Sequence, residues 1–266
     1  MRSIREMTAM HGRVAAITGG AGHIGRAFAE SLAQTGCDVC LLDVATDRAV
    51  SEASRLAARY GIRARGVEVD LADEAAVERA AEQVQGEFGR LDVLVNNAAY
   101  AKTDASVDGK PIEEQTLAQW DPNVDVSLRG TFLATRAFVP LLRAAKSATV
   151  INIASIYGVT GPDMRLYDGL PMVNEAWYAA AKGGIVQLTR YCSTTLAPTI
   201  RVNCIAPGGV WRGQPDAFVE RYVQRTPLRR MCTEEDLCGA LVYFASDLSA
   251  YVTGQVLLVD GGWTTW

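Results

Sequence analysis

Ser155, Tyr178 and Lys182 are the side chains whose types and spacing could together perform one reaction. Tyr178 and Lys182 are four residues apart in a segment, Trp-Tyr-Ala-Ala-Ala-Lys, that is typical of the start of a helix. This spacing places both side chains on one helical face, a turn apart. An ammonium group ~5 Å from a phenol would stabilise the phenolate by about 3 kcal/mol and bring its pKa, normally about 10, closer to neutral pH. We therefore expect Tyr178 to act as a general acid/base that is tuned by Lys182.

Ser155 follows the apolar run 148–154, which predicts a buried strand. At the carboxyl end of that strand, the hydroxyl could donate a hydrogen bond to a carbonyl or alkoxide oxygen as charge develops on it. The alternative is that Tyr-x-x-x-Lys has arisen by chance and that Ser155 simply ends a strand. The choice between these interpretations depends on the other motifs of the chain.

A glycine turn near the N-terminus joins an apolar run, 14–17, to a helical pattern over 26–34. Gly20, Gly22 and Gly25 match the pattern G-x-G-x-x-G. In that pattern the glycines allow a tight turn, close approach of the backbone to a pyrophosphate, and close packing of the helix on the strand. The phosphates would lie at the N-terminus of the helix, where free backbone N–H groups and the helix dipole favour anions. By itself such a turn is weak evidence, because many strands are joined to helices by glycines.

Asp43 ends a second predicted strand, 38–42, eighteen residues after Gly25. An acidic residue at this position hydrogen-bonds the 2′-hydroxyl of an adenosine ribose and repels a 2′-phosphate, which favours NAD over NADP. The alternatives are an exposed aspartate at the end of a strand, and an effect of the nearby Arg48 on the choice of cofactor.

Strands and helices alternate along the whole chain, at the spacing of right-handed βαβ units. The predicted strands are 14–17, 38–42, 63–69, 91–95, 148–154, 201–205 and 255–259, and the predicted helices are 26–34, 49–60, 73–88, 112–146 with an interruption near Pro122, 178–196 and 234–246. The sequence therefore predicts an α/β fold, a doubly wound parallel Rossmann sheet of about seven strands. We expect one domain over 1–266, with 1–11 as a flexible tail.

Composition excludes several classes of function. The net charge of −4 argues against nucleic acid as the main partner, and no apolar run approaches the roughly 18 residues of a membrane span. Cys37 and Cys40 would lie roughly 10 Å apart on a strand, beyond the reach of a disulfide. No second cysteine pair follows at zinc-binding spacing, so we expect no metal and reduced, buried cysteines. Without a signal-peptide core at the start, the protein is expected in the cytoplasm.

Taken together, these motifs resemble the short-chain dehydrogenase/reductase family, in its compact single-domain branch, over nearly the whole chain. The resemblance is carried by the glycine turn 18–25, Asp43, Asp70-Leu71, Asn96-Asn97-Ala98, Ser155, Tyr178-x-x-x-Lys182, Pro207-Gly208 and Asp260-Gly-Gly. It implies that Tyr178 is the acid/base, that Ser155 polarises the reacting oxygen, and that Lys182 also holds the nicotinamide ribose. A hydride would then pass between the nicotinamide and a secondary alcohol or ketone. The cofactor residues implied are Gly19, Gly22, His23, Ile24, Gly25, Asp43, Asp70, Leu71, Asn97, Ala98, Tyr178, Lys182, Pro207, Gly208 and Val210.

Three positions depart from the usual pattern of that family. His23 replaces the middle glycine of the turn, where it could contact the cofactor or simply be an exposed turn residue. Ser127 stands where an asparagine usually completes a proton relay, so we expect an altered relay that includes Ser127. Arg212 replaces the threonine that usually follows Pro-Gly and meets the nicotinamide amide.

Ser155 and Tyr178 are also about ten residues further apart than is usual in the family. We expect the extra segment, 160–175, to cover the mouth of the pocket together with 211–231. The substrate-binding residues expected there are Arg165, Tyr167, Asn174 and Arg212. These segments resemble dehydrogenases of bacterial surface-polysaccharide and flagellin-glycan synthesis. A wall of short polar groups and arginines would suit a polyhydroxylated or anionic substrate. The alternative is that the arginines only form a solvated lid, namely Arg212, Arg221, Arg225, Arg229 and Arg230, and for the last three this alternative is preferred.

The leading hypothesis is an NAD-dependent enzyme that oxidises a secondary hydroxyl of a sugar, cyclitol or sugar conjugate. The alternatives are a reductase of a less polar ketone or 3-oxoacyl substrate, and a sensor that binds NAD without turning it over. The family resemblance also implies a homotetramer, paired through the helices 123–146 and 178–197, although the apolar faces of these helices could equally pack on the sheet.

Overall fold

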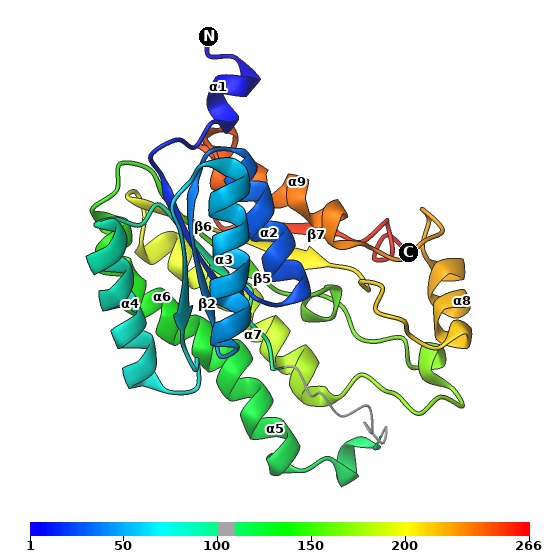
Figure 1. Ribbon diagram of the computed structural model, residues 1–266. Helices are drawn as coiled ribbons and strands as arrows, with labels where there is room; N and C mark the ends of the chain where they lie inside the picture. The colour runs from blue at the N-terminus through cyan, green and yellow to red at the C-terminus, as the bar shows by residue number, and fades with distance from the viewer. Residues whose placement is uncertain (101–109) are drawn as a thin grey trace.

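The computed structural model describes residues 1–100 and 110–266. In this part of the chain seven parallel strands form one sheet, in the order β3-β2-β1-β4-β5-β6-β7 (Figure 1). The strands are β1 (Val14–Thr18), β2 (Asp38–Asp43), β3 (Ala64–Glu68), β4 (Val93–Asn96), β5 (Ala148–Ile153), β6 (Ile200–Pro207) and β7 (Val256–Val259). The strand order reverses between β1 and β4, and this switch point leaves a crevice at the carboxyl ends of the strands. The predicted doubly wound sheet is therefore confirmed.

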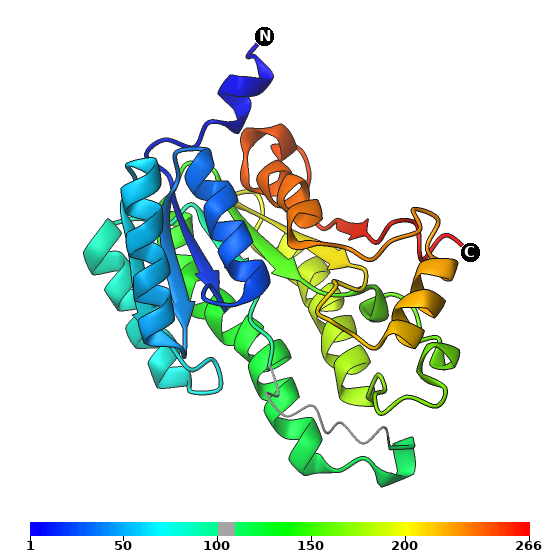
Figure 2. The same ribbon diagram turned by 45° about the vertical axis from the view of Figure 1, so that its right-hand side comes forward.

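Helices cover both faces of the sheet (Figures 1 and 2). One face carries α2 (His23–Gln34), α3 (Thr46–Tyr60) and α9 (Glu234–Ala245), and the other carries α4 (Glu74–Phe88), α6 (Gly130–Arg143) and α7 (Ala176–Thr195). Successive residues of a strand point to opposite faces, so β1 contributes Ile17 to the first core and Ala16 to the second. Because both faces are covered, all five residues of β1 are buried.

The long helical stretch expected over 112–146 is divided in the structure. A short turn (Ile112–Glu114) precedes α5 (Leu117–Val124), and a π-helical turn (Asp125–Arg129) joins α5 to α6. Pro122 lies inside α5, just before the π turn. Wider turns of this kind are rare and often occur at functional sites, and this one carries Ser127.

The structure has a helix in each of two segments for which the sequence predicted none. The N-terminal segment, expected as a flexible tail, forms α1 (Ile4–Thr8), whose capping box joins Ser3 and Glu6. The arginine-rich segment 211–231 contains α8 (Asp216–Arg225), which lies beside the insertion 160–175 in both views (Figures 1 and 2). Within that insertion the only helical element is one short 3-10 helix, Met164–Tyr167.

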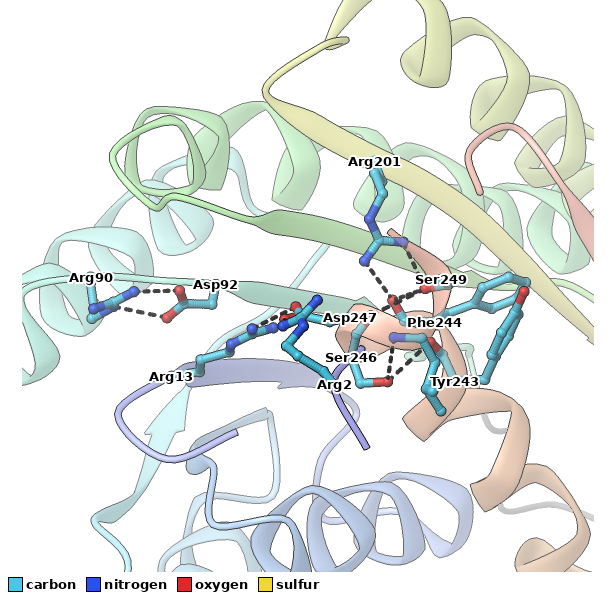
Figure 3. Close-up of polar contacts among 11 residues, drawn as sticks. Arg2, Arg13, Arg90, Asp92, Arg201, Tyr243, Phe244, Ser246, Asp247 and Ser249 are labelled. Atoms are coloured by element: carbon cyan, nitrogen blue, oxygen red, sulfur yellow. Dashed lines mark hydrogen bonds and ion pairs between the residues drawn. The ribbon is translucent and has the colours of Figure 1, made fainter. Parts of the chain in front are cut away.

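Ion pairs lie near the amino ends of the strands, on the side of the sheet opposite the crevice (Figure 3). Arg2 and Arg13 both donate to the carboxylate of Asp247, at 2.5 and 2.6 Å. Burial acts to raise the pKa of Asp247, but the hydrogen bonds from Arg13 and Arg2 outweigh it and hold that pKa below its usual value. These contacts fasten the chain before β1 to the chain after α9, away from the crevice. Among the described helices none is long and apolar enough to cross a membrane.

Candidate active site

Ser155 and Tyr178 are brought together by the packing of α7 on the turn that follows β5. Ser155 stands two residues after β5 and caps the short turn Ile156–Gly158, where its Oγ accepts a hydrogen bond of 3.2 Å from the N–H of Tyr157. Gly158 in that turn lies so close to α7 that a Cβ there would be 2.6 Å from the carbonyl oxygen of Lys182. A residue with a side chain would force the turn away from the helix, so this close approach requires glycine.

Lys182 is buried, with 4% of its surface exposed, and its Nζ donates a hydrogen bond of 2.9 Å to the carbonyl oxygen of Ile153. The same nitrogen is 5.9 Å from the centroid of the Tyr178 ring. The predicted alignment of the two side chains on one face of α7 is therefore present, and the amine also ties the helix to the end of β5.

Burial, and not charge, dominates the ionisation of this pair. It raises the pKa of the Tyr178 phenol, and hydrogen bonding with Ser155 acts in the opposite direction. Burial also lowers the pKa of Lys182 from 10.5 to about 8. The sequence predicts that Lys182 lowers the pKa of Tyr178. Burial acts against this effect, and the tuning of the phenol by Lys182 stays a prediction. Desolvation disfavours the charged form of each group, so the pKa of the phenol rises while that of the amine falls.

A cavity of about 350 Å³ opens at the carboxyl ends of the strands and contains Ser155, Tyr178 and Lys182 in its wall. It brings these three residues together with eight others that the sequence singled out: Ile24, Asn97, Pro207, Gly208, Val210, Tyr167, Asn174 and Arg212. A crevice at this position in an open α/β sheet is the usual place for a ligand.

The glycine turn beside the cavity has the shape of a phosphate cradle. Gly19 has a positive φ of +64°, and a Cβ on Gly25 would lie 2.1 Å from the carbonyl oxygen of Gly19. Asn97 braces the turn from β4 with hydrogen bonds from Nδ2 to the carbonyl oxygens of Thr18 (3.0 Å) and Gly19 (3.2 Å). Helix α2 begins directly after the turn, and Gly22 at its N-cap offers no side chain to its backbone N–H groups. These residues therefore fit the pyrophosphate of a dinucleotide.

Asp43 is fixed against this turn. Its Oδ2 accepts a hydrogen bond of 2.9 Å from the N–H of Ala21, and its Oδ1 accepts one of the same length from the N–H of Ala45. The carboxylate is thus held at the end of β2, beside the glycines, where an adenosine ribose would lie.

Several other candidates lie outside the wall of the cavity. His23 is exposed in the first turn of α2, and the N–H of Ala98 donates to Thr18 Oγ1 at 3.1 Å. Asp70 is exposed and accepts a hydrogen bond from the N–H of Ala72, whereas Leu71 is buried in the core. Ser127 is buried in the π turn, which packs on α7.

Arg165 does not reach the cavity, so its predicted role in substrate binding is not supported. Its side chain is 79% exposed and binds both oxygens of Asp163, each at 2.8 Å. Asp163 also accepts a hydrogen bond of 2.6 Å from Arg225, which therefore holds the insertion against α8 and is not merely a solvated lid residue.

The expected polar wall is present only in part: Asn174 and Arg212 line the cavity, but most of the other residues that the segments 160–175 and 211–231 contribute are aromatic or aliphatic. The residues that sequence reasoning missed are Ile156, Tyr157, Met172, Phe218, Tyr222 and Met231. Five of these six are core members of one cluster with Tyr167 and Trp263, and Met172 packs against it. A sequence signal did exist for two of them: Phe218 and Tyr222 are four residues apart and form one apolar face of a short helix.

Comparison with known proteins shows the family of this chain. Residues 19–264 match the family model described as enoyl-(acyl carrier protein) reductase. The chain is 35% identical to cis-4-hydroxycyclohexanecarboxylate dehydrogenase of Sinomonas cyclohexanicum, over 95% of this chain and 96% of that protein. It is 30% identical to 3-oxoacyl-(acyl carrier protein) reductase of Aquifex aeolicus, over 95% of this chain and 98% of that one. The chain belongs to the short-chain dehydrogenase/reductase family.

Solved structures of short-chain dehydrogenase/reductases share the whole fold. The NADPH-dependent 3-quinuclidinone reductase of Rhodotorula rubra superposes with a TM-score of 0.89 at 30% identity, over 100% of this chain and 96% of that one. The protein is accordingly a dehydrogenase/reductase that acts on CH–OH groups and uses a nicotinamide cofactor. Among the described residues, no group of three histidine, cysteine or acidic side chains is arranged to hold a metal ion.

Proposed function

We propose that this short-chain dehydrogenase/reductase uses NAD to oxidise a secondary hydroxyl group of a compact ring substrate, such as a sugar, a cyclitol or a sugar conjugate. The observation that carries the proposal is the single cavity that contains Ser155, Tyr178 and Lys182 beside the glycine turn and Pro207-Gly208. Its aromatic wall would pack on the apolar face of a ring, and its tyrosine hydroxyls and Asn174 would meet the ring's polar groups. The 35% identity with a dehydrogenase of a hydroxylated cyclohexane ring supports a ring substrate.

In the proposed reaction Tyr178 removes the proton of the substrate hydroxyl. Ser155 accepts a hydrogen bond from the N–H of Tyr157, and its own O–H, which interacts with the Tyr178 phenol, would donate to the substrate oxygen once a substrate lies between them. Lys182 would hold the nicotinamide ribose, and Ser127 would pass the proton onward from the π turn. The bound nicotinamide supplies the hydride acceptor.

The proposed preference for NAD rests on Asp43. Two backbone N–H groups hold its carboxylate beside the glycine turn, where a 2′-phosphate would be repelled. Since the structurally similar quinuclidinone reductase is NADPH-dependent, the fold alone does not decide the cofactor. The pyrophosphate side of the site would be formed by Gly19, Gly22, Gly25 and Asn97, with His23 and Ile24 in the first turn of α2. The adenosine would lie toward Asp70, Leu71 and Ala98. The nicotinamide would lie beside Val210.

Two further properties are part of the proposal. Exposed apolar side chains on the helices that flank the site, Leu117, Phe132 and Tyr191, support association into a homotetramer. All six cysteines are free, which supports a reducing compartment such as the cytoplasm.

The test is reduction of NAD and NADP by the purified enzyme with a panel of cyclitols, nucleotide sugars and cis-4-hydroxycyclohexanecarboxylate. We expect turnover with NAD and a ring alcohol. Tyr178→Phe should lower kcat by roughly 10²-fold or more, because it removes the acid/base, while NAD binding measured by fluorescence stays nearly intact. Activity that survives in Tyr178→Phe would refute the acid/base assignment.

The aromatic wall favours a second candidate, the reduction of a less polar ketone or a 3-oxoacyl substrate. Turnover with acyl thioesters or steroids alone, and with no ring alcohol, would select this candidate over the first.

A further inference from the structure

Tyr157 and Tyr167 form a pair of hydroxyl groups in the wall of the cavity. Their two oxygens are 3.2 Å apart, and the side chains belong to residues that are 9% and 8% exposed. Tyr157 comes from the turn that begins at Ser155, and Tyr167 comes from the insertion 160–175. The pair therefore exists only because the insertion folds back over the end of β5.

Both rings are held firmly. The ring of Tyr157 meets Trp263 edge to face at 5.9 Å, and the ring of Tyr167 lies 5.4 Å from Phe218 of α8. On either side of Tyr167, the carbonyl oxygens of Leu166 and Asp168 accept hydrogen bonds from Arg221, at 3.2 and 2.7 Å. The two hydroxyls are thus in place before any ligand binds.

The hydrogen-bonding capacity of the pair is only partly used. One phenol donates to the other, and among the described residues neither oxygen has a further partner. Burial raises the pKa of both phenols, so both keep their protons at neutral pH. One O–H donor and several lone pairs therefore remain for a ligand in the cavity.

The pair lies close to the proposed reaction centre. Tyr178 packs against the cluster that contains Tyr157 and Tyr167, and all three side chains line the same cavity. A ligand group bound by the pair would consequently sit on a ring position near the reacting carbon.

We propose that Tyr157 and Tyr167 recognise a second hydroxyl group of the substrate, so that the preferred substrates are compact ring diols or polyols. This inference rests on the proposed oxidation of a ring alcohol. A ligand hydroxyl both donates and accepts, as the pair requires, whereas a methylene group would leave the free O–H unpaired and a carboxylate could not donate. The cavity of about 350 Å³ is small for a ligand site and must also admit the nicotinamide ring, which favours a compact substrate.

The experiment compares kcat/KM for cis-1,2-cyclohexanediol and cyclohexanol with NAD, in the wild-type enzyme and in Tyr157→Phe and Tyr167→Phe. We expect the wild type to prefer the diol by about tenfold or more, and each variant to bring the ratio toward one. Loss of packing would affect both alcohols alike and cancels in the ratio. Tyr243→Phe is the control: it removes a phenol hydroxyl of α9 that does not line the cavity, so its ratio should stay at the wild-type value.

An active wild-type enzyme with no preference for the diol would overturn the inference, and this measurement does not depend on whether a variant folds. The inference is also overturned if the ratio stays unchanged in both Tyr157→Phe and Tyr167→Phe, or if it falls equally in Tyr243→Phe. Failure of the wild type to oxidise any ring alcohol would instead overturn the proposed function itself.

Discussion

The Nζ atom of Lys182 donates a hydrogen bond to the carbonyl oxygen of Ile153 across 2.9 Å, and so joins the helix that carries Tyr178 to the strand that leads to Ser155. The amine is buried, and its pKa falls from 10.5 to about 8 because desolvation disfavours its charge. A buried lysine whose charge is disfavoured in this way should make the stability of the protein depend on pH.

In the wild-type protein the free energy of unfolding should depend on pH in a way that is absent from Lys182→Met. Between about pH 8 and the ordinary lysine pKa of about 10.4, the unfolded chain holds a proton that the folded protein has released. The stability contribution of Lys182 should therefore rise with pH in this window, on the order of 1 kcal/mol per pH unit, whereas below it the full cost of burial remains. The measurement is urea unfolding of both proteins without cofactor from neutral to alkaline pH. If the free energy of unfolding changed with pH in the same way in both proteins, Lys182 would have an ordinary pKa in the folded state.

Asp43→Asn should shift the preference between the two cofactors. The substitution keeps the shape of the side chain and one acceptor oxygen, but removes the negative charge beside the glycine turn. We expect the ratio of kcat/KM for NADP to that for NAD to rise by about tenfold or more, since the repulsion of a 2′-phosphate is lost. Asp47→Asn is the control, because Asp47 is an exposed carboxylate at the start of α3. An equal shift in both variants would mean that general charge, and not Asp43, selects the cofactor.

Arg225 and Arg165 bind the same carboxylate but should differ in importance. Arg225 reaches Asp163 from α8 at 2.6 Å, and its guanidinium also lies 4.7 Å from the centroid of the Trp263 ring. We expect Arg225→Met to cost about 1–2 kcal/mol in the free energy of unfolding and to raise KM several-fold, because it releases the insertion that carries Tyr167. Arg165→Met should cost less than about 0.5 kcal/mol, since that side chain is 79% exposed.

Urea unfolding and steady-state kinetics of the two variants would decide the matter. Equal costs for Arg225→Met and Arg165→Met, or a change in kcat without one in KM, would contradict the role of Arg225 in holding the cavity wall.

The sequence by itself determined the fold and the position of the candidate site. Alternating strands and helices of this spacing can form only a few topologies, and the carboxyl ends of parallel strands meet at one edge. Residues that directly follow strands, such as Asp43, Ser155 and Pro207, are therefore placed by local pattern alone. The spacing of Tyr178 and Lys182 likewise defines one face of a helix without reference to the rest of the molecule.

Only the tertiary structure decided the lining of the cavity and the ionisation of its groups. The insertion 160–175 has almost no regular secondary structure, so the direction of each side chain depends on partners far along the chain, such as Arg225 for Asp163. The place of Arg165 in this insertion predicted a side chain near the pocket, whereas the structure turns it outward and lines the wall with aromatic rings from separate segments of the chain. The pKa values of Tyr178 and Lys182 depend in the same way on burial, which arises from the packing of elements distant in sequence and not from the residues beside them.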